Sequence, residues 1–271
     1  MTGSAEGLSR LILELREKTG AGMMDCKKAL AEAGGRMDEA MTALRKKGLA
    51  HAAKISSRAT KEGLIAFASE EGRGALIELN CETDFVARTG DFGQLGAALA
   101  RAAASGRLSG PQDAAPAIEP VFQKLRENIA LRRWQRYEPR TPGHVAGYIH
   151  LGGKTGAMIE VGASSAAEAL SSELKELAKE LLFQIVALSP RFLDRTGVSA
   201  ADVAREREIY TELLRKEGKL GKLFYQAFCL LEQPYVRDNK TPITALIEQA
   251  AKKLGGPAPT VRRFIRYQLG E

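Results

Sequence analysis

The sequence contains very little cysteine. Three cysteines occur among 271 residues, Cys26, Cys81 and Cys229, and they lie far apart, with no CxxC pair and no cysteine–histidine cluster. A disulfide framework and a zinc site are therefore not expected, and a reducing compartment suits the chain best. The three histidines show no metal-ligand spacing to a cysteine or carboxylate, and no HExxH motif occurs.

Long apolar runs are also missing. No stretch approaches the ~18–20 apolar residues that a membrane-spanning helix needs. Residues 1–7 have neither a basic region nor an apolar core, so no secretory signal is expected. These absences predict a cytoplasmic protein without a membrane partner.

Positive charge is in excess but is not gathered in one block. The formal net charge is +7 and the pI is about 9.3, which favours an acidic partner, either nucleic acid or an acidic protein face. The basic runs are short, such as residues 45–47, and short runs are typical of solvated faces. An RNA-binding protein stays open as an alternative, supported weakly by the arginines near Trp134 and Tyr137.

Catalytic motifs are absent as well. Gly152-Gly153-Lys154-Thr155 resembles the end of a phosphate-binding loop, but Tyr148 stands where that loop needs a glycine. The segment leads into an alternating apolar run and not into a helix, so we expect a hairpin turn there. No G-x-S-x-G elbow occurs. We therefore predict that the chain is not an enzyme, with an unrecognised active site as the second alternative.

The first sixty residues predict three short helices. Apolar residues recur at helical spacing in three successive stripes: Leu8, Leu11, Ile12 and Leu15; Cys26, Ala29, Leu30 and Ala33; and Met37, Ala40, Met41 and Leu44. Glycines interrupt the pattern at 20–22 and 34–35, as they do just past helix ends. A basic connector, residues 54–61, follows.

Two hairpins of similar sequence come next. Leu64–Ser69 and Ala75–Cys81 predict strands around a glycine-containing turn. The segments 147–149 and 156–161 repeat this pattern, 84 and 82 residues later by their glycines. An alanine-rich helical segment follows each hairpin, so the pattern indicates an internal duplication of a hairpin-plus-helix unit.

The other segments complete an α+β fold. One helix is expected to begin at about Asp91, which can serve as its N-cap. Further helices are expected over 118–129, 170–188, 203–217 and 242–254. A loop is expected over 105–120 and a final strand over 261–267. A chain of this length is enough for roughly two domains. We predict a three-helix module at 1–54, a first core subdomain at 55–140 and a second at 141–271.

Two segments have a pattern that leaves their role open. In Leu15–Leu30, Cys26 lies on the apolar stripe with Met23 near it, whereas Met24 is about 200° away around the helix and is predicted to point outward. Adjacent methionines at a helix start can form a pliable contact surface. The pattern alone favours core positions for both methionines.

The second segment is Glu78–Arg88. A predicted strand runs straight into Thr83-Asp84, which can cap a new helical turn that carries Phe85. An aromatic side chain on such a turn can project as a wedge or pack beneath the sheet. The pattern alone favours the core for Phe85.

These segments contain the motifs TGAGMMDCKKAL and ELNCETDFVAR, and the chain later reads CLLEQPYVRD over 229–238 and RFIRYQLGE over 263–271. In this order, over most of the chain, they resemble the motifs of the elongation factor Ts family. The resemblance implies a protein that binds the GTPase elongation factor Tu and speeds GDP release so that GTP can rebind. It also implies a ubiquitin-associated-like fold for the helical module and a duplicated core, with no cofactor, no bound metal and no stable nucleic-acid binding.

The same resemblance implies site residues. The family's contacts with the GTPase match Arg16, Met23 and Met24 in the helical module. The segment that reaches toward the Mg²⁺ site of the GTPase matches Thr83, Asp84, Phe85 and Val86. Gln184 matches a position where a core helix contributes a polar side chain near the wedge and contacts the partner. One departure is a helical hairpin before Cys229 that is shorter here by about one helix, which puts any contact of its tip in doubt.

Overall fold

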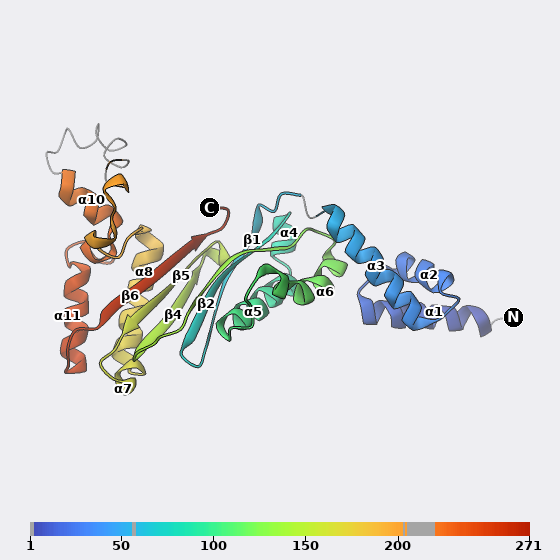
Figure 1. Ribbon diagram of the computed structural model, residues 1–271, viewed down its shortest axis with the longest axis horizontal. Coiled ribbons are helices and arrows are strands. Elements are labelled where there is room, and N and C mark those ends of the chain that lie inside the picture. The colour runs from blue at the N-terminus through green and yellow to red at the C-terminus, as the bar shows by residue number, and fades with distance from the viewer. Residues whose placement is uncertain (1–2, 56–57, 203, 205–219) are drawn as a thin grey trace.

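The N-terminal part of the chain forms a three-helix module. The computed structural model describes residues 3–55, 58–202, 204 and 220–271. Helices α1 (Gly3–Thr19), α2 (Met23–Glu32) and α3 (Met37–Ile55) pack around a small apolar core centred on Leu15, Cys26 and Leu30. The three expected helices are confirmed, and Figure 1 shows them at one end of an elongated molecule.

Glycine allows the tight turns of this module. Gly20 follows α1 with a φ of 67°, and Gly34 and Gly35 follow α2 with φ values of 58° and 81°. The Gly35 amide donates to the carbonyl of Leu30 at 2.8 Å, which closes the end of α2. This left-handed conformation is accessible to glycine because it has no Cβ, so the helices reverse direction within a few residues.

The first half of the core is a three-stranded antiparallel sheet. Its order is β1 (Glu62–Glu70), β2 (Arg73–Cys81) and β3 (Ala130–Tyr137). Between β2 and β3 the chain forms α4 (Asp84–Ala87), α5 (Gly90–Ala104), the 3-10 helix η1 (Pro111–Ala114) and α6 (Ala115–Leu125). Helix α5 covers the outer face of this sheet and buries Phe92 and Leu99 against it.

The second half repeats this plan. Strands β4 (Gly143–His150), β5 (Thr155–Gly162) and β6 (Thr260–Gln268) form the second sheet. The 3-10 turn η2 (Leu151–Gly153) joins β4 to β5, so the hairpin turn predicted at residues 152–155 is confirmed. The remaining elements among the described residues are α7 (Ala166–Ala169), α8 (Ser172–Leu188), η3 (Arg195–Gly197), α10 (Leu220–Phe228), η4 (Leu230–Glu232) and α11 (Ile243–Leu254). Helix α8 covers the outer face of this sheet, and α11 packs against α8 in the same apolar cluster.

The two sheets stack face to face, so the core has four layers (Figure 1). Ile65 and Leu76 of the first sheet meet Val145 and Met158 of the second in a shared apolar cluster. At Gly147 a Cβ would come within 2.3 Å of the Phe67 ring, so this close approach depends on a glycine. The central strands β2 and β5 are buried on both faces, because a helix layer covers one face and the other sheet covers the second.

The two halves match element by element. A β-bulge in β3 lies opposite Glu78 of β2, a second one in β6 lies opposite Glu160 of β5, and the two glutamates are 82 residues apart. The same offset separates the N-cap residues of α4 and α7 and those of α5 and α8, which are Thr83 with Ser165 and Thr89 with Ser171. The α+β class and the duplicated hairpin-plus-helix core are confirmed. The subdomain boundaries fall near α3, β3 and β4, but separate folding of the parts stays a prediction.

The structure differs from the expectations around α5 and α6. Thr89, and not Asp91, caps α5, because its hydroxyl accepts from the Phe92 amide at 3.3 Å. The helix expected to reach residue 129 ends at Leu125, where Arg126 takes a left-handed φ of 60°. The expected loop over 105–120 contains η1 and the start of α6.

Strand β3 is missing from the expectations altogether. Its bulge opposite Glu78 breaks the alternation of side chains, and arginines occupy several of its positions. A strand whose charged residues are neutralised by distant partners has no apolar period-two pattern to reveal it. The expected helix over 203–217 and the shortened hairpin lie mostly outside the described residues.

Candidate protein-contact site

A sharp turn between β2 and α5 carries the segment Thr83–Val86. Thr83 is the N-cap of the single-turn helix α4, and its hydroxyl accepts from the Val86 amide at 3.4 Å. The Cys81 thiol donates to the Thr83 carbonyl at 3.2 Å. The expected cap is therefore confirmed at Thr83, and the turn is bonded at its base.

Phe85 points away from the protein. Its side chain is 82% exposed, whereas that of the next residue, Val86, is 7% exposed and packs into the core of the first half. Successive side chains on a helix are about 100° apart, so burying Val86 turns Phe85 outward. The core interpretation of Phe85 is thus wrong. A large exposed aromatic on a firmly held turn is typical of a protein contact.

Asp84 precedes Phe85, and its ion pair within the same turn is a weak one. Its carboxylate pairs with Arg88 one turn later at 2.9 Å; the Arg88 side chain is largely in solvent and that of Asp84 is partly exposed. Exposed ion pairs of this kind contribute about 0–1 kcal/mol. Asp84 can therefore exchange Arg88 for a group on a partner at little cost.

A second exposed apolar surface lies at the start of α2. Met24 is 73% exposed and Met23 is 42% exposed, so the outward orientation of Met24 is confirmed and the core interpretation of both residues is wrong. Arg16 of α1 is also exposed. Asp25, which directly follows Met24, pairs with Lys47 at 2.5 Å and with Arg126 of the core at 3.3 Å.

Gln184 does not belong to this surface. Its side chain is fully buried, and its amide donates to the Gln233 side chain at 3.0 Å and to the Pro234 carbonyl at 3.1 Å. Its oxygen accepts from the Val236 amide at 2.8 Å. Gln184 lies on α8, which packs on the second sheet, whereas α4 packs on the first. The expectation that Gln184 lies near Phe85 and contacts the partner is corrected: a fully buried side chain offers no surface, and its contacts hold residues 233–236.

One residue that braces the Phe85 turn was not predictable from local sequence pattern. The carboxylate of Glu127, just past α6, accepts from the amides of Glu82 and Thr83 at 3.1 and 3.0 Å and from the Thr83 hydroxyl at 2.5 Å. Glu127 and Thr83 are 44 residues apart, and no local pattern connects them. Only the folded chain brings this acceptor to the turn.

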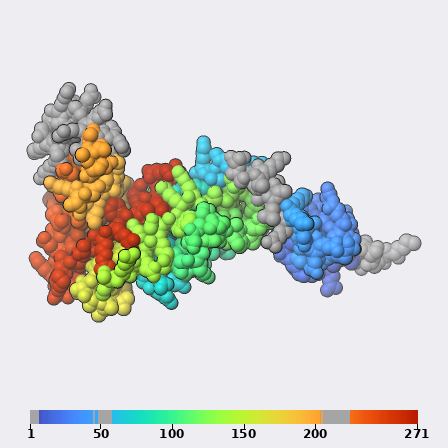
Figure 2. Space-filling view, viewed as in Figure 1, coloured from blue at the N-terminus to red at the C-terminus, as the bar shows by residue number. Residues whose placement is uncertain are grey.

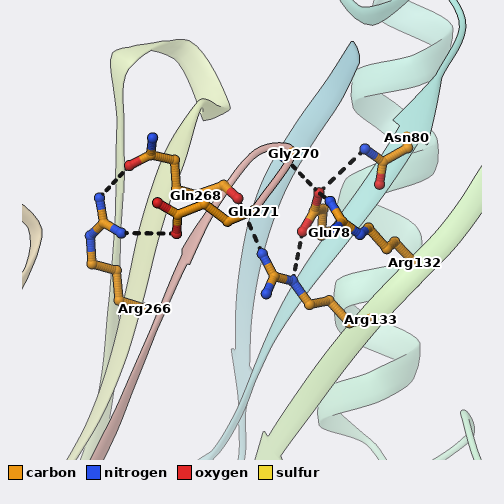
Figure 3. A network of polar contacts seen from close by, with 8 residues as sticks. All are labelled: Glu78, Asn80, Arg132, Arg133, Arg266, Gln268, Gly270 and Glu271. Atoms are coloured by element: carbon orange, nitrogen blue, oxygen red, sulfur yellow. Dashed lines mark hydrogen bonds and ion pairs between the residues drawn. The ribbon is translucent and has the colours of Figure 1, made fainter. Parts of the chain in front are cut away.

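A buried carboxylate ties the C-terminus to the first half (Figure 3). Glu78 is fully buried and accepts from Arg132 at 3.0 Å, from Arg133 at 2.6 Å and from the Gly270 amide at 3.1 Å. Burial raises the pKa of the Glu78 carboxyl, but the Gly270 amide and Arg133 outweigh burial and hold the pKa below its usual value. Glu78 is thus stabilised in its ionised form.

The second half has the same arrangement and interlocks with the first. Glu160 pairs with Arg262 and Arg263 at 3.0 and 2.6 Å. Arg133 lies over the Tyr267 ring at 4.2 Å, and Arg263 lies over the Tyr137 ring at 4.1 Å. Each half therefore places an arginine on a tyrosine of the other. The arginines near Trp134 and Tyr137 have partners within the protein, which weakens the argument that they contact RNA.

The described part of the chain holds neither a metal-binding cluster nor a reactive thiol. Within it, no group of three or more histidine, cysteine, aspartate or glutamate side chains could hold a metal ion. Burial raises the pKa of the Cys81 thiol to about 12 and that of Cys229 to about 11, so neither forms a reactive thiolate at neutral pH. None of the described helices combines the length and apolar character that crossing a membrane requires.

The fold and its surface define a class: an α+β protein with a duplicated four-layer core and two exposed apolar segments, one on a helical module and one on a braced turn. A family profile described as Elongation factor TS matches residues 82–271. A relative named Elongation factor Ts from Nitratidesulfovibrio vulgaris (strain DP4) is 42% identical over 275 residues, with 96% of this chain and 95% of the relative covered. The relative of that name from Symbiobacterium thermophilum is 40% identical over 284 residues, covering 98% and 93%. The chain belongs to the elongation factor Ts family of translation elongation factors.

Proposed function

We propose that this chain binds the GTPase elongation factor Tu and speeds the release of its GDP, so that GTP can rebind during translation elongation. The observation that carries the proposal is the exposed Phe85 on the capped turn of α4, with Asp84 beside it. An aromatic side chain in solvent contributes little to its own fold and gains apolar contact when it enters a gap in a partner. Membership in the family supports the choice of partner.

The exchange itself needs no bond chemistry. GDP is held on a GTPase by phosphate contacts and by Mg²⁺, which is a large local charge. Phe85 wedges between helices of the GTPase, and Asp84 leaves Arg88 to disturb the groups that organise the metal. By linkage, if this chain weakens GDP binding by some factor, GDP weakens the binding of this chain by the same factor. The ternary complex is therefore short-lived, and incoming GTP displaces this chain.

The helical module anchors the encounter. Met23 and Met24 present flexible apolar side chains that adapt to a partner surface, and Arg16 adds a positive charge nearby. In this proposal the chain works in the cytoplasm, holds no nucleotide or metal of its own, is not an enzyme, and binds no nucleic acid stably.

The test is a stopped-flow measurement of fluorescent GDP leaving elongation factor Tu, with increasing amounts of this chain. We expect the release rate to rise and then saturate. An unchanged release rate at every concentration contradicts the proposal, and so does calorimetry that shows tight GDP binding to this chain alone. RNA binding that falls steeply with salt, without any effect on GDP release, would favour the RNA-binding alternative.

A further inference from the structure

Three consecutive residues after α6 reach three different parts of the molecule. We call Arg126, Glu127 and Asn128 the 126–128 junction. Arg126 contacts the helical module, Glu127 contacts the Phe85 turn, and Asn128 contacts both that turn and the segment that leads from the module to β1. In Figure 1 the loop after α6 lies between the module and the core.

Glu127 provides the bonds to the turn. Its two carboxylate oxygens receive the Glu82 amide, the Thr83 amide and the Thr83 hydroxyl. The same Thr83 hydroxyl accepts from the Val86 amide and so caps the turn that carries Phe85. Hydrogen bonds to an ionised acceptor are roughly twice as strong as neutral ones, so this carboxylate restrains the direction in which the turn leaves the sheet.

Arg126 provides the bond to the module. Its guanidinium pairs with Asp25 at 3.3 Å, and Asp25 directly follows the exposed Met24. Arg126 ends α6 with a φ of 60°, a conformation that glycine adopts most readily at this position. An arginine here accepts some backbone strain, and its side chain bridges to the module.

Asn128 completes the link. Its backbone amide donates to the Glu82 side chain at 2.8 Å, and its side-chain amide donates to the Arg58 carbonyl at 2.9 Å. Arg58 lies in the connector just before β1 and also pairs with Glu82 at 3.5 Å. The connector, the turn and the end of α6 thus form one hydrogen-bonded unit.

We propose that the 126–128 junction is a positioning element that holds the methionine surface and the Phe85 turn in one fixed relation, so that a GTPase bound at Met23 and Met24 meets Phe85 and Asp84 already in place. The inference rests on the proposed exchange function and adds the residues that align its two contact segments. Two weak contacts reinforce each other only when their geometry permits simultaneous engagement, and a rigid connection lowers the entropy lost on binding.

The first experiment concerns Glu127 and measures GDP release from elongation factor Tu. Glu127→Ala removes all three bonds to the turn, and we expect the maximal release rate to fall roughly tenfold while the half-saturating concentration changes less than about threefold. Glu127→Gln keeps a carbonyl acceptor for the two amides and should recover most of the rate. Glu70→Ala is the matched control, because it removes the same charge from the far tip of the β1–β2 hairpin.

Hydrogen exchange provides a reading that does not depend on the GTPase. The Thr83 amide should exchange faster in Glu127→Ala, while the amides of β2 exchange as in the wild type. A Glu127→Ala protein with the wild-type maximal rate overturns the role of Glu127. An unchanged exchange rate of the Thr83 amide in Glu127→Ala also overturns it, because the carboxylate would then not hold the turn.

The second experiment concerns Arg126 and its pair with Asp25. Arg126→Gly suits the left-handed backbone, so the protein should melt at the wild-type temperature or slightly above it. We expect the half-saturating concentration to rise about threefold, since the pair is only partly shielded from solvent, and the maximal rate to stay within about twofold. Asp25→Asn should give the same change, and the double variant should be no worse than either single one. Fully additive effects overturn the link through Asp25.

The outcomes separate this inference from the proposed function. If the wild-type chain fails to speed GDP release, the proposed function itself is wrong. If the wild type is active and the Glu127 and Arg126 variants behave like it, the function stands and the 126–128 junction has no part in it.

Discussion

The α4 turn of the first half and the α7 turn of the second are built alike and differ in what they carry. Thr83 and Ser165 cap the two turns, 82 residues apart. At the same offset, Asp84 corresponds to Ala166 and Phe85 to Ala167. Duplication therefore supplied two equivalent turns that leave the sheets, and only the first bears an acid and a projecting aromatic.

The two turns also differ in what holds them. Glu168, within the α7 turn itself, accepts from the Ser164 amide at 3.0 Å, so that turn is closed by a neighbour in sequence. The α4 turn depends on Glu127, 44 residues beyond Thr83. The difference teaches that a repeated fold does not repeat its details: the turn that carries the proposed contact residues is the one held by a residue distant in sequence.

The largest expected effect compares two phenylalanines of the first half. Phe92 is fully buried on the face of α5 that packs against the first sheet, so Phe92→Ala should lower the free energy of unfolding by about 3–5 kcal/mol. Phe85→Ala should lower it by less than about 1 kcal/mol, because the ring is in solvent. Chemical denaturation of both variants measures this difference.

The same Phe85→Ala protein should be defective in exchange. Its affinity for elongation factor Tu should fall by about 1–3 kcal/mol, the range of an interface anchor. The GDP-release rate at saturation should fall too, since saturation removes the binding deficit but does not replace the missing wedge. A Phe85→Ala protein that melts normally and drives release at full speed when saturating would rule out the wedge.

Removing residues 1–54 should weaken the interaction and leave the core folded. The module has its own apolar cluster around Leu15 and Leu30, and the four-layer core has separate ones. We expect affinity for the GTPase to fall roughly tenfold, about 1.4 kcal/mol, because the surface at Met23 and Met24 is lost. Isothermal calorimetry measures the affinity, and loss of a cooperative melting transition would show that the boundary is misplaced.

A smaller effect on the free energy of unfolding is expected when acid protonates Glu78. Its pKa is below the usual 4.5 in the folded state, so the unfolded chain binds more protons there and stability falls as pH falls. This contribution is fully present above pH 4.5 and is lost as pH drops through the lowered folded value. Glu78→Gln should be less stable at neutral pH and should lose less stability on acidification. Urea titrations from neutral pH to about pH 3 test this, and a Glu78→Gln protein with the wild-type acid dependence would contradict it.

The smallest effect is expected from copying the first turn onto the second. Ala166 and Ala167 are exposed, so Ala166→Asp with Ala167→Phe should change stability by less than about 0.5 kcal/mol. GDP release should not change, and the graft should not rescue Phe85→Ala, since α7 lies on the other sheet and away from the helical module. Rescue in the stopped-flow assay would show that the residues alone suffice, wherever the fold places them.

Much of the architecture was predictable from local pattern. The stripes through Leu15, Cys26 and Leu44 predict three helices, and the repeated glycines at 63 and 147 indicate the duplication. Strand β3 was not predictable in this way, because Arg132 and Arg133 pair with the buried Glu78 of the neighbouring strand, and no local pattern reveals this partner. The role of Glu127 was missed, and Gln184 was expected at the surface, for the same reason: their hydrogen-bond partners are 44 or more residues away.

By itself, the sequence determined the class of fold, the helical periodicity of the module, the motifs that identify the family and the cap at Thr83, because all of these depend on neighbours within a few residues. The tertiary structure decided which side chains face solvent. Phe85 and Val86 are adjacent and both apolar, and only packing of Val86 against the first-half core turns Phe85 outward. It also decided that Gln184 is internal and that Glu127 braces the turn, because long-range contacts, and not local pattern, set burial and hydrogen-bond partners.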